Sequence, residues 1–246
     1  MNVSVCMATF NGSAYVEHQL RSILAELGHD DEVVIVDDAS ADDTVSVIEG
    51  LDDPRVRVIR APKNRGYVRS FEEAMLDARG EVILLADQDD EWVPGRVAVL
   101  SAAARSTGFA ASNLEILGSG EPLRSPLSGR PWRVSASTSR HRVRNELRIL
   151  TGTAPYFGCA MAVRRDVLAA ITPLPAFVTE SHDLWIATVA NAAGRMSHVD
   201  AVTVRRRIHD ANASSPRPRG LRRALASRWM LLRAWSEARR RRTLLD

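Results

Sequence analysis

Residues 82–90 read VILLADQDD, so five apolar residues run directly into three aspartates and one glutamine. A short apolar run of this kind is typical of a buried β-strand. Two earlier runs are built in the same way, because residues 3–8 lead into the polar stretch 9–12 and residues 32–36 lead into the aspartates 37–38. Ligands of parallel sheets bind beyond the carboxyl ends of the strands, so the sequence predicts one site assembled from several strand ends.

Segments with helical spacing separate these strands and predict the fold class. Residues 15–27, 68–78 and 93–104 each carry apolar side chains three or four positions apart. Alternating strands and helices predict an α/β fold with a mostly parallel central sheet and helices on both faces. Beyond this region we expect loops and an acceptor-side insertion over 106–150, strands over 156–163 and 196–206, and helices over 165–171 and 182–193.

Charge is distributed unevenly along the chain and indicates a separate C-terminal segment. Of the net charge of +3, residues 216–246 contribute +8, since ten arginines oppose Glu237 and Asp246, which leaves 3 − 8 = −5 for the rest. A nucleic-acid-binding domain would carry the basic charge on the fold itself, so we expect no nucleic-acid partner. The expected organisation is one domain over 1–215 and a basic amphipathic tail over 216–246.

The tail repeats large apolar residues at steps of three or four, which predicts an amphipathic helix. Two interpretations remain open: contact with an anionic membrane surface, or packing against the domain or a partner chain. The apolar positions are Leu221, Leu225, Trp229, Leu232 and Trp235.

The sequence contains no apolar run long enough to span a bilayer and no pattern typical of a signal peptide at its N-terminus. We therefore expect a cytoplasmic protein, peripheral at the inner face of the cell membrane if the tail binds lipid. Cys6 and Cys159 fit no metal-ligand spacing along the chain, and both are expected to be buried, reduced thiols.

Residues 87–91 place four carboxylates within five positions, and each should be charged at neutral pH. Such repulsion is relieved by a hard cation, which predicts a Mg²⁺ or Mn²⁺ site with positions left for substrate phosphates. The alternative is a solvated acidic turn or a helix start favoured by the helix dipole.

Several separated motifs resemble the inverting glycosyltransferases of family 2, which have the GT-A fold. Asp87-Gln88-Asp89 is similar to the DXD motif of these enzymes. Other segments that match the family pattern in the same order are 5–12, 34–40, 64–66, 156–167, 181–185 and 207–214.

The resemblance implies a site for a nucleotide-diphosphate sugar and a divalent metal. Asp38 matches an acid that accepts a hydrogen bond from a pyrimidine imide, which uracil and thymine possess and cytosine lacks. The role of Arg69 is uncertain, because the matching helix position often carries Asn. The implied nucleotide-sugar-binding residues are Thr9, Phe10, Asn11, Glu17, Asp38, Asn64, Arg65, Gly66, Asp87 and Gln88, and the implied metal ligands are Asp89, Asp87 and His209.

Inversion at an anomeric carbon needs one base for the acceptor hydroxyl and a cation for the leaving diphosphate. The resemblance assigns the base to Asp183 and the acceptor side to His182, Trp185 and Asp90. Asp183 falls in the predicted first turn of a helix, where the dipole should keep it ionised. Without the resemblance, ordinary helix capping would be the favoured explanation of this aspartate.

The motif pattern is closest to the rhamnosyltransferase-like branch, which implies dTDP-L-rhamnose as donor and a saccharide or glycolipid as acceptor, in polysaccharide or glycolipid assembly. The alternative within the family is a transferase for a UDP-hexose: galactose, glucose or GlcNAc. Alternatives of other classes are a metal-dependent nucleotidyl or phosphoryl transferase and a non-catalytic binding module. The former should show a phosphate-cradling Gly-rich loop, and the sequence has none.

Overall fold

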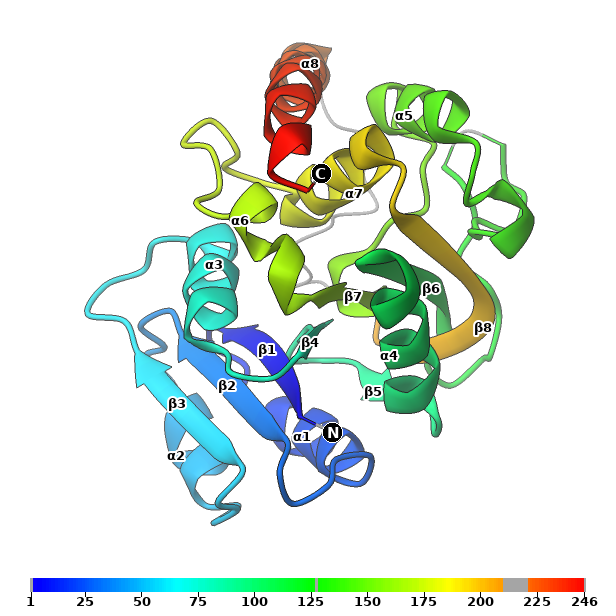
Figure 1. Ribbon diagram of the computed structural model, residues 1–246. Helices are drawn as coiled ribbons and strands as arrows, with labels where there is room; N and C mark the ends of the chain where they lie inside the picture. Colours follow the sequence, from blue (N-terminus) through cyan, green and yellow to red (C-terminus); the bar gives the residue numbers. More distant parts are fainter. Residues whose placement is uncertain (1, 127, 210–220, 246) are drawn as a thin grey trace.

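The computed structural model describes residues 2–126, 128–209 and 221–245. Within them, one eight-stranded sheet carries helices on both faces (Figure 1). The strand order is β3-β2-β1-β4-β7-β6-β8-β5. The strands are β1 (Val3–Thr9), β2 (Glu32–Asp37), β3 (Val56–Arg60), β4 (Val82–Ala86), β5 (Glu91–Trp92), β6 (Phe109–Ile116), β7 (Met161–Arg164) and β8 (Met196–Arg206).

The helices lie in two layers. Helices α1, α2 and α4 share one hydrophobic core with one face of the strands, while α3, α5, α6, α7 and α8 share another with the opposite face. The α-helices are α1 (Val16–Leu24), α2 (Thr44–Glu49), α3 (Tyr67–Asp77), α4 (Arg96–Thr107), α5 (Arg142–Thr151), α6 (Leu168–Ile171), α7 (His182–Ala193) and α8 (Leu221–Arg241). Short 3₁₀ turns cover Ala136–Thr138, Gly158–Ala160, Arg165–Val167 and Arg242–Leu244.

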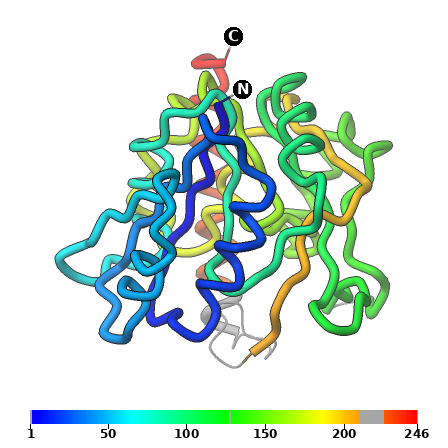
Figure 2. Tube along the Cα trace, turned by 90° about the horizontal axis from the view of Figure 1, so that it is seen from below, coloured from blue at the N-terminus to red at the C-terminus, as the bar shows by residue number. Residues whose placement is uncertain are grey.

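The first half of the sheet confirms the predicted parallel arrangement. Strand β1 pairs in parallel with β2 and β4, and β2 pairs in parallel with β3. Side chains alternate between the two cores, so Val33 and Ile35 enter one core while Val34 and Val36 enter the other. Figures 1 and 2 show this blue-to-cyan half on one side of the molecule and the green segment on the other.

The second half is mixed, because β7 lies antiparallel between β4 and β6. The expectation of loops over 106–150 was wrong, since this stretch contains β6 and α5. Both elements bury polar side chains, which conceals their periodicity in the sequence. In β6, the amide of Asn113 is buried and donates to the carbonyls of Val134 and Asp200.

The strand expected over 156–163 is shorter and begins only at Met161. The residues before it form a 3₁₀ turn, in which Gly158 lies close to the start of α7. The next residue, Cys159, lies within 4.8 Å of ligand atoms of Asp87 and Asp90.

Helix α8 packs against the domain with one face. Leu231, Ala234 and Ala238 are buried in the core shared with α7. Packing against the domain, one of the two interpretations of the tail, is therefore confirmed for this face; residues 216–220 lie outside the described residues. Across the described parts of the chain, no helix is both long and apolar enough to cross a membrane.

Candidate active site

The carboxyl ends of β1 and β2 meet as predicted. The hydroxyl of Thr9 donates to Asp37 at 2.9 Å, and both side chains are buried. Asn11 has a positive φ of 48°. Two hydrogen bonds hold this conformation, because the Asn11 N–H donates to the Ser40 hydroxyl and the Asn11 side-chain oxygen accepts from the N–H of Ala41. The polar loop after β1 is thereby fixed to the loop after β2.

The side chain of Gln88 joins the loop after β4 to the loop after β1. Its amide accepts from the N–H of Phe10 at 2.9 Å and donates to the carbonyl of the same residue at 3.1 Å. A Cβ at Gly12 would lie 2.3 Å from the Gln88 oxygen, so glycine is required there for this side chain to lie flat. The second residue of the DXD-like motif therefore contacts the loop expected to hold the nucleotide.

Asp38 holds a third loop at the same edge of the sheet. Its two carboxylate oxygens accept from the backbone N–H groups of Arg65 and Gly66, both at 2.8 Å, and the N–H of Gly66 also lies 3.1 Å from the Asn64 oxygen. Asp38 is 2% exposed. Each carboxylate oxygen can accept two hydrogen bonds, so this structural role leaves an acceptor position for a base.

The acidic cluster after β4 turns towards the protein interior. Ligand atoms of Asp87, Asp90 and Cys159 all lie within 4.8 Å of one another. Asp89 contacts His209 instead, with one carboxylate oxygen 2.7 Å from Nε2 of His209. The structure thus brings together the predicted metal ligands Asp89 and His209 from positions 120 residues apart.

Burial shifts two of these aspartates away from ordinary ionisation. Burial, followed by the charge of Asp89, raises the pKa of Asp87 to about 6, so Asp87 is still largely ionised at neutral pH, as expected. Burial, with the charges of Asp87 and Asp89, raises the pKa of Asp90 to about 8, so the expectation of full ionisation is wrong for Asp90. The physical reason is that a low-dielectric site disfavours adjacent like charges.

Arg206, at the end of β8, is a cationic side chain whose charge acts on this cluster. Burial works against its charge, but the Cys159 thiol and Asp87, Asp90 and Asp89 raise the pKa of Arg206. Its charge in turn lowers the pKa values of Asp87 and Asp90. A permanent guanidinium beside carboxylates is suited to a diphosphate as well.

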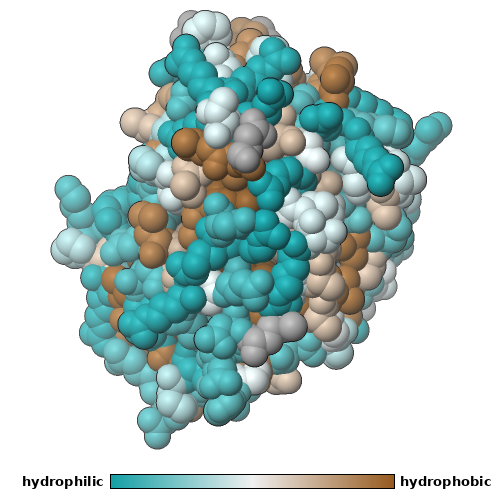
Figure 3. Space-filling view, viewed as in Figure 1, coloured by the Kyte–Doolittle hydropathy of each residue, from teal (hydrophilic) through white to brown (hydrophobic). Residues whose placement is uncertain are grey.

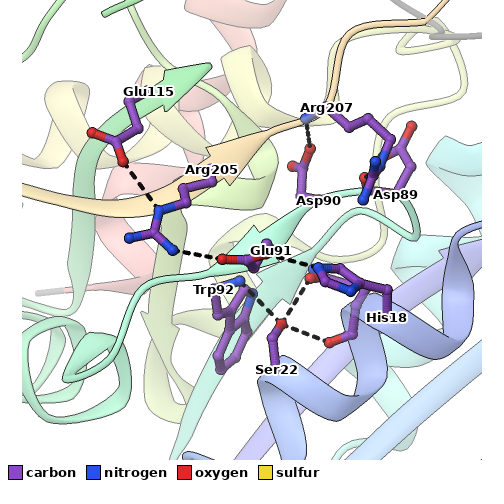
Figure 4. A network of polar contacts seen from close by, with 10 residues as sticks. His18, Ser22, Asp89, Asp90, Glu91, Trp92, Glu115, Arg205 and Arg207 are labelled. Carbon is purple, nitrogen blue, oxygen red and sulfur yellow. Dashed lines mark hydrogen bonds and ion pairs between the residues drawn. The ribbon is translucent and has the colours of Figure 1, made fainter. Parts of the chain in front are cut away.

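Pairing between β5 and β8 holds the arginines against the acids. Glu91 lies opposite Arg205 in the ladder, and their side chains form an ion pair at 2.6 Å. Figure 4 also shows a second contact between the two segments, in which the backbone N–H of Arg207 donates to Asp90 at 3.1 Å. The Arg207 side chain also donates to the Asp89 carbonyl at 3.1 Å.

Tyr15 fixes the ring of His209. The two rings stack with centroids 4.6 Å apart and an interplanar angle of 22°. The guanidinium of Arg207 lies 5.4 Å from the same Tyr15 ring. The start of α1 therefore supports the histidine that the DXD-like loop faces.

Asp183 lies in the first turn of α7, as predicted, but its electrostatic setting differs from the expectation. Burial raises the pKa of Asp183 to about 6, against the lowering effect of the N–H groups of Leu184 and Gly158 that it accepts from. Asp183 also raises the pKa of Asp87, and Arg206 lowers the pKa of both, so the three groups share one site. Desolvation outweighs the helix dipole here.

Close packing around Gly158 positions Asp183. A Cβ at residue 158 would lie 2.8 Å from Nε2 of His182 and 3.7 Å from Cβ of Asp183. Tyr67 closes the other side, where its hydroxyl accepts from the N–H of Ser181 at 2.9 Å. Asp183, the residue expected to act as the base, thus lies on α7 and is enclosed by the turn before β7 and by the start of α3.

Three residues expected on the acceptor side are placed differently. Trp185 is 1% exposed and its indole N–H donates to the Ile171 carbonyl, so it belongs to the core and cannot contact an acceptor. His182 is buried and stacks on Phe71 with centroids 4.3 Å apart, and burial lowers its pKa to about 3. Asp90 is 1% exposed and lies on the metal side of the cluster.

Two side chains expected near the nucleotide are engaged elsewhere on the surface. Glu17 is exposed and pairs with Arg21 one turn further along α1. The Arg65 side chain pairs with Glu73 of α3, although its backbone N–H binds Asp38. Arg69, whose role was uncertain, is structural: it pairs with Glu72 and donates to three carbonyls, those of Leu174, Pro175 and Val178.

Sequence reasoning missed Gly158 and Cys159 and gave Arg206 no distinct role among three adjacent arginines. Gly158 and Cys159 come from the turn before β7, and Arg206 comes from the end of β8. Periodicity and spacing contain no signal for Gly158 and Cys159, because only the pairing of β7 with β4 brings the turn before β7 to the aspartates. The alternation of three arginines along β8 could have indicated that one of them faces inward.

The mixed eight-stranded sheet with helices on both faces is a GT-A fold, and an acidic cluster with a facing histidine lies at the carboxyl ends of its strands. The family model described as "Glycosyl transferase family 2" matches residues 4–172, and the chain belongs to this family. The recognition of the family and of its fold from the sequence is thereby confirmed.

Among curated relatives, the chain is 34% identical over 118 residues to the succinoglycan biosynthesis protein ExoO of Rhizobium meliloti, covering 47% of this chain and 34% of that protein. It is 32% identical over 111 residues to the GalNAc(5)-diNAcBac-PP-undecaprenol beta-1,3-glucosyltransferase of Campylobacter jejuni, covering 44% and 36%. The matched part spans about a third of the length of the first curated relatives.

Among solved structures, TarS 1-349 of S. aureus matches with a TM-score of 0.64 at 20% identity, covering 83% of this chain and 60% of that chain. The mannosyltransferase PcManGT of Pyrobaculum calidifontis, in complex with GDP-Man and Mn²⁺, matches with a TM-score of 0.58 at 20% identity, covering 81% and 54%. These likenesses concern the fold.

The residues present fit a divalent cation. Within the described part of the chain, one oxygen of Asp90 is buried and has no hydrogen-bond partner, which is costly unless a ligand meets it. Asp89 and His209 supply oxygen and imidazole ligands suited to Mn²⁺, and oxygen ligands alone suit Mg²⁺.

Proposed function

We propose that the protein transfers one sugar from a pyrimidine-nucleotide diphosphate to an acceptor hydroxyl with inversion at the anomeric carbon. The best candidate donor is dTDP-L-rhamnose, and a UDP-hexose is the alternative. The proposed role is in polysaccharide or glycolipid assembly, at the inner face of the cell membrane. Printed names of two relatives support this setting, since they refer to succinoglycan biosynthesis and to an undecaprenol-linked glycan.

One observation carries the proposal: the turn before β7 links Asp183 to the acidic cluster, since a Cβ at Gly158 would lie 3.7 Å from Cβ of Asp183 while Cys159 lies within 4.8 Å of Asp87 and Asp90. A general base with a pKa near 6 is largely ionised at neutral pH yet still basic enough to accept a proton. In this proposal, the reacting carbon lies between Asp183, at the N-terminus of α7, and the acidic cluster after β4.

In the proposed reaction, Asp183 removes the proton from the acceptor hydroxyl as its oxygen forms a bond to the anomeric carbon. The bond from that carbon to the diphosphate breaks on the opposite face. Arg206 and Arg207 stabilise the negative charge that accumulates on the diphosphate. A Mn²⁺ or Mg²⁺ held by Asp89, His209 and Asp87 would supply Lewis-acid stabilisation of the same charge.

The nucleotide is proposed to lie over the ends of β1 and β2. Thr9, Phe10 and Asn11 form the floor, and the loop 64–66 that Asp38 holds forms the rim. The exposed Phe10 ring offers a stacking surface for a base. A pyrimidine imide N–H directed at Asp38 would favour uracil and thymine over cytosine, which lacks this N–H.

The test is a thermal-shift panel of UDP-, dTDP- and GDP-sugars with and without Mn²⁺. A specifically bound ligand at 100 times its Kd stabilises the native state by about 2.7 kcal/mol. We expect stabilisation by one pyrimidine nucleotide sugar, and only with the metal present. Stabilisation by GDP-sugars alone would contradict the role of Asp38, and no stabilisation by any of them would contradict the proposed function.

A further inference from the structure

Helix α5 exposes apolar side chains although part of its buried face is polar. Its buried face carries Asn145 and Glu146 together with Ile149, while Val143 and Leu147 are 74% and 57% exposed. Exposed apolar residues four positions apart lie on one side of a helix. A helix that buries polar residues and exposes apolar ones gains nothing from that exposed face in the isolated protein.

Helix α8 has a second apolar stripe opposite to its buried one. Leu225, Trp229 and Leu232 recur at steps of four and three, and Leu225 and Trp229 are 62% and 65% exposed. The face with Leu231 and Ala234 packs inward. The second stripe is therefore available for an external contact.

The two stripes belong to one surface of the molecule. Arg228 of α8 donates to the Thr151 carbonyl at the end of α5, at 3.1 Å, and Arg239 lies close enough to lower the pKa of Glu146. Figure 1 shows both helices on the outer side of α7, and Figure 3 shows hydrophobic atoms among hydrophilic ones at the top of the molecule, where these helices lie.

This surface is strongly basic. Among its acids, Glu146 is buried and burial raises its pKa to about 8, while Glu237 pairs with Arg240 and Arg241. Apolar residues surrounded by arginines match an anionic lipid interface, in which chains enter the acyl boundary and guanidinium groups meet phosphates. The exposed arginines around the stripes are Arg140, Arg142, Arg144, Arg233, Arg239 and Arg240.

We propose that the α5–α8 surface, defined by Val143, Leu147, Leu225, Trp229 and Leu232 with the surrounding arginines, docks on an anionic membrane. A second copy of the chain is a poorer occupant, because a symmetric contact would place the same arginines of both copies against one another.

The position of the surface relative to the base agrees with this. Ser227 of α8 donates to Glu180 at 2.6 Å, three residues before Asp183. Docking would thus hold the acceptor side of the proposed active site close to the lipid surface, where a lipid-linked acceptor is presented. The docking itself requires no donor or metal and is tested separately from the transfer reaction.

The experiment is co-sedimentation of the full chain with two kinds of vesicle. One is pure phosphatidylcholine, and the other also contains about 30% phosphatidylglycerol as the anionic lipid. We expect binding to the anionic vesicles alone, weakened by salt. Leu225→Ser with Trp229→Ser should abolish it, and Arg140→Gln with Arg144→Gln should lower the partition coefficient about 25-fold, at about fivefold for each arginine.

The matched control is Leu76→Ser, because Leu76 is an equally exposed leucine on α3. Its vesicle binding should equal that of the unmodified protein, and all variants should keep the same melting temperature. Unchanged vesicle binding by the Leu225→Ser, Trp229→Ser variant would overturn the proposal. A dimer in gel filtration that this variant converts to a monomer, without vesicle binding, would instead assign the surface to self-association.

Discussion

If Asp183 is the base, as proposed, its ionisation sets the pH range of the transfer reaction. Because burial raises the pKa of Asp183 to about 6, its carboxyl is mostly protonated below that pH and mostly ionised above it. We predict that kcat/KM falls about tenfold for each pH unit below 6 and is level between about 7 and 8. A pH–rate profile with saturating metal measures this, and a profile that stays level down to pH 4.5 would contradict the burial argument.

Gly158 has no side chain, and this allows the turn before β7 to pack closely against His182 and Asp183. In Gly158→Ala, the new methyl would lie 2.8 Å from His182 and displace the first turn of α7. We predict a loss of about 100-fold in kcat, since a displacement of about 1 Å can cost that much, with donor affinity retained.

Gly28→Ala serves as the control for this variant, because the methyl there meets only Asp31 at an ordinary 3.5 Å. Steady-state kinetics and donor titration on both variants distinguish the effects. Equal activity of Gly158→Ala and Gly28→Ala would show that Asp183 is not held by this contact.

At the scale of elements, burial of Glu146 on α5 lowers the free energy of unfolding by an amount that depends on pH. Burial raises its pKa in the folded state to about 8, above the ordinary value of about 4.5, and neither carboxylate oxygen has a hydrogen-bond partner among the described residues. The unfolded chain therefore releases the proton more readily, so the folded state loses stability as the pH rises from about 4.5 to about 8.

We predict that Glu146→Gln removes this pH dependence. The variant should match the unmodified protein at pH 5 and exceed it by roughly 1–3 kcal/mol at pH 8.5. Urea unfolding at the two pH values measures the difference. If the difference between the two proteins were the same at both pH values, the carboxyl of Glu146 would not be buried in the folded state.

The elements that sequence reasoning predicted and missed differ in how they bury polar groups. Strands β1, β2 and β4 are continuous apolar runs, so both they and the polar residues at their carboxyl ends were predictable. Strand β6 buries Asn113 and helix α5 buries Asn145 and Glu146, so their periodicity was obscured. The additional site residue Cys159 was not predictable from spacing, because it approaches Asp87 and Asp90 only through the crossing of β7 beside β4.

At the scale of the whole molecule, α8 contributes side chains to the core. Ending the chain at the expected boundary, residue 215, should therefore lower the stability of the domain. Leu231, Ala234 and Ala238 are buried, and Arg241 lies over the Trp185 ring at 5.2 Å. We predict that a chain ending at residue 215 loses at least about 3 kcal/mol of stability and melts roughly 10 °C lower. Scanning calorimetry measures this, and an unchanged melting temperature would make α8 a separable tail.

The central claim is that Asp183 acts as the base opposite a metal-bound diphosphate. The most direct measurement combines calorimetric titration of the pyrimidine nucleotide sugar, in the presence of Mn²⁺, with the transfer rate of Asp183→Asn. The account predicts unchanged donor affinity and a transfer rate at least about 1,000-fold lower, within the range expected when a general base is removed. Transfer at the rate of the unmodified protein, with the donor bound equally well, would contradict it.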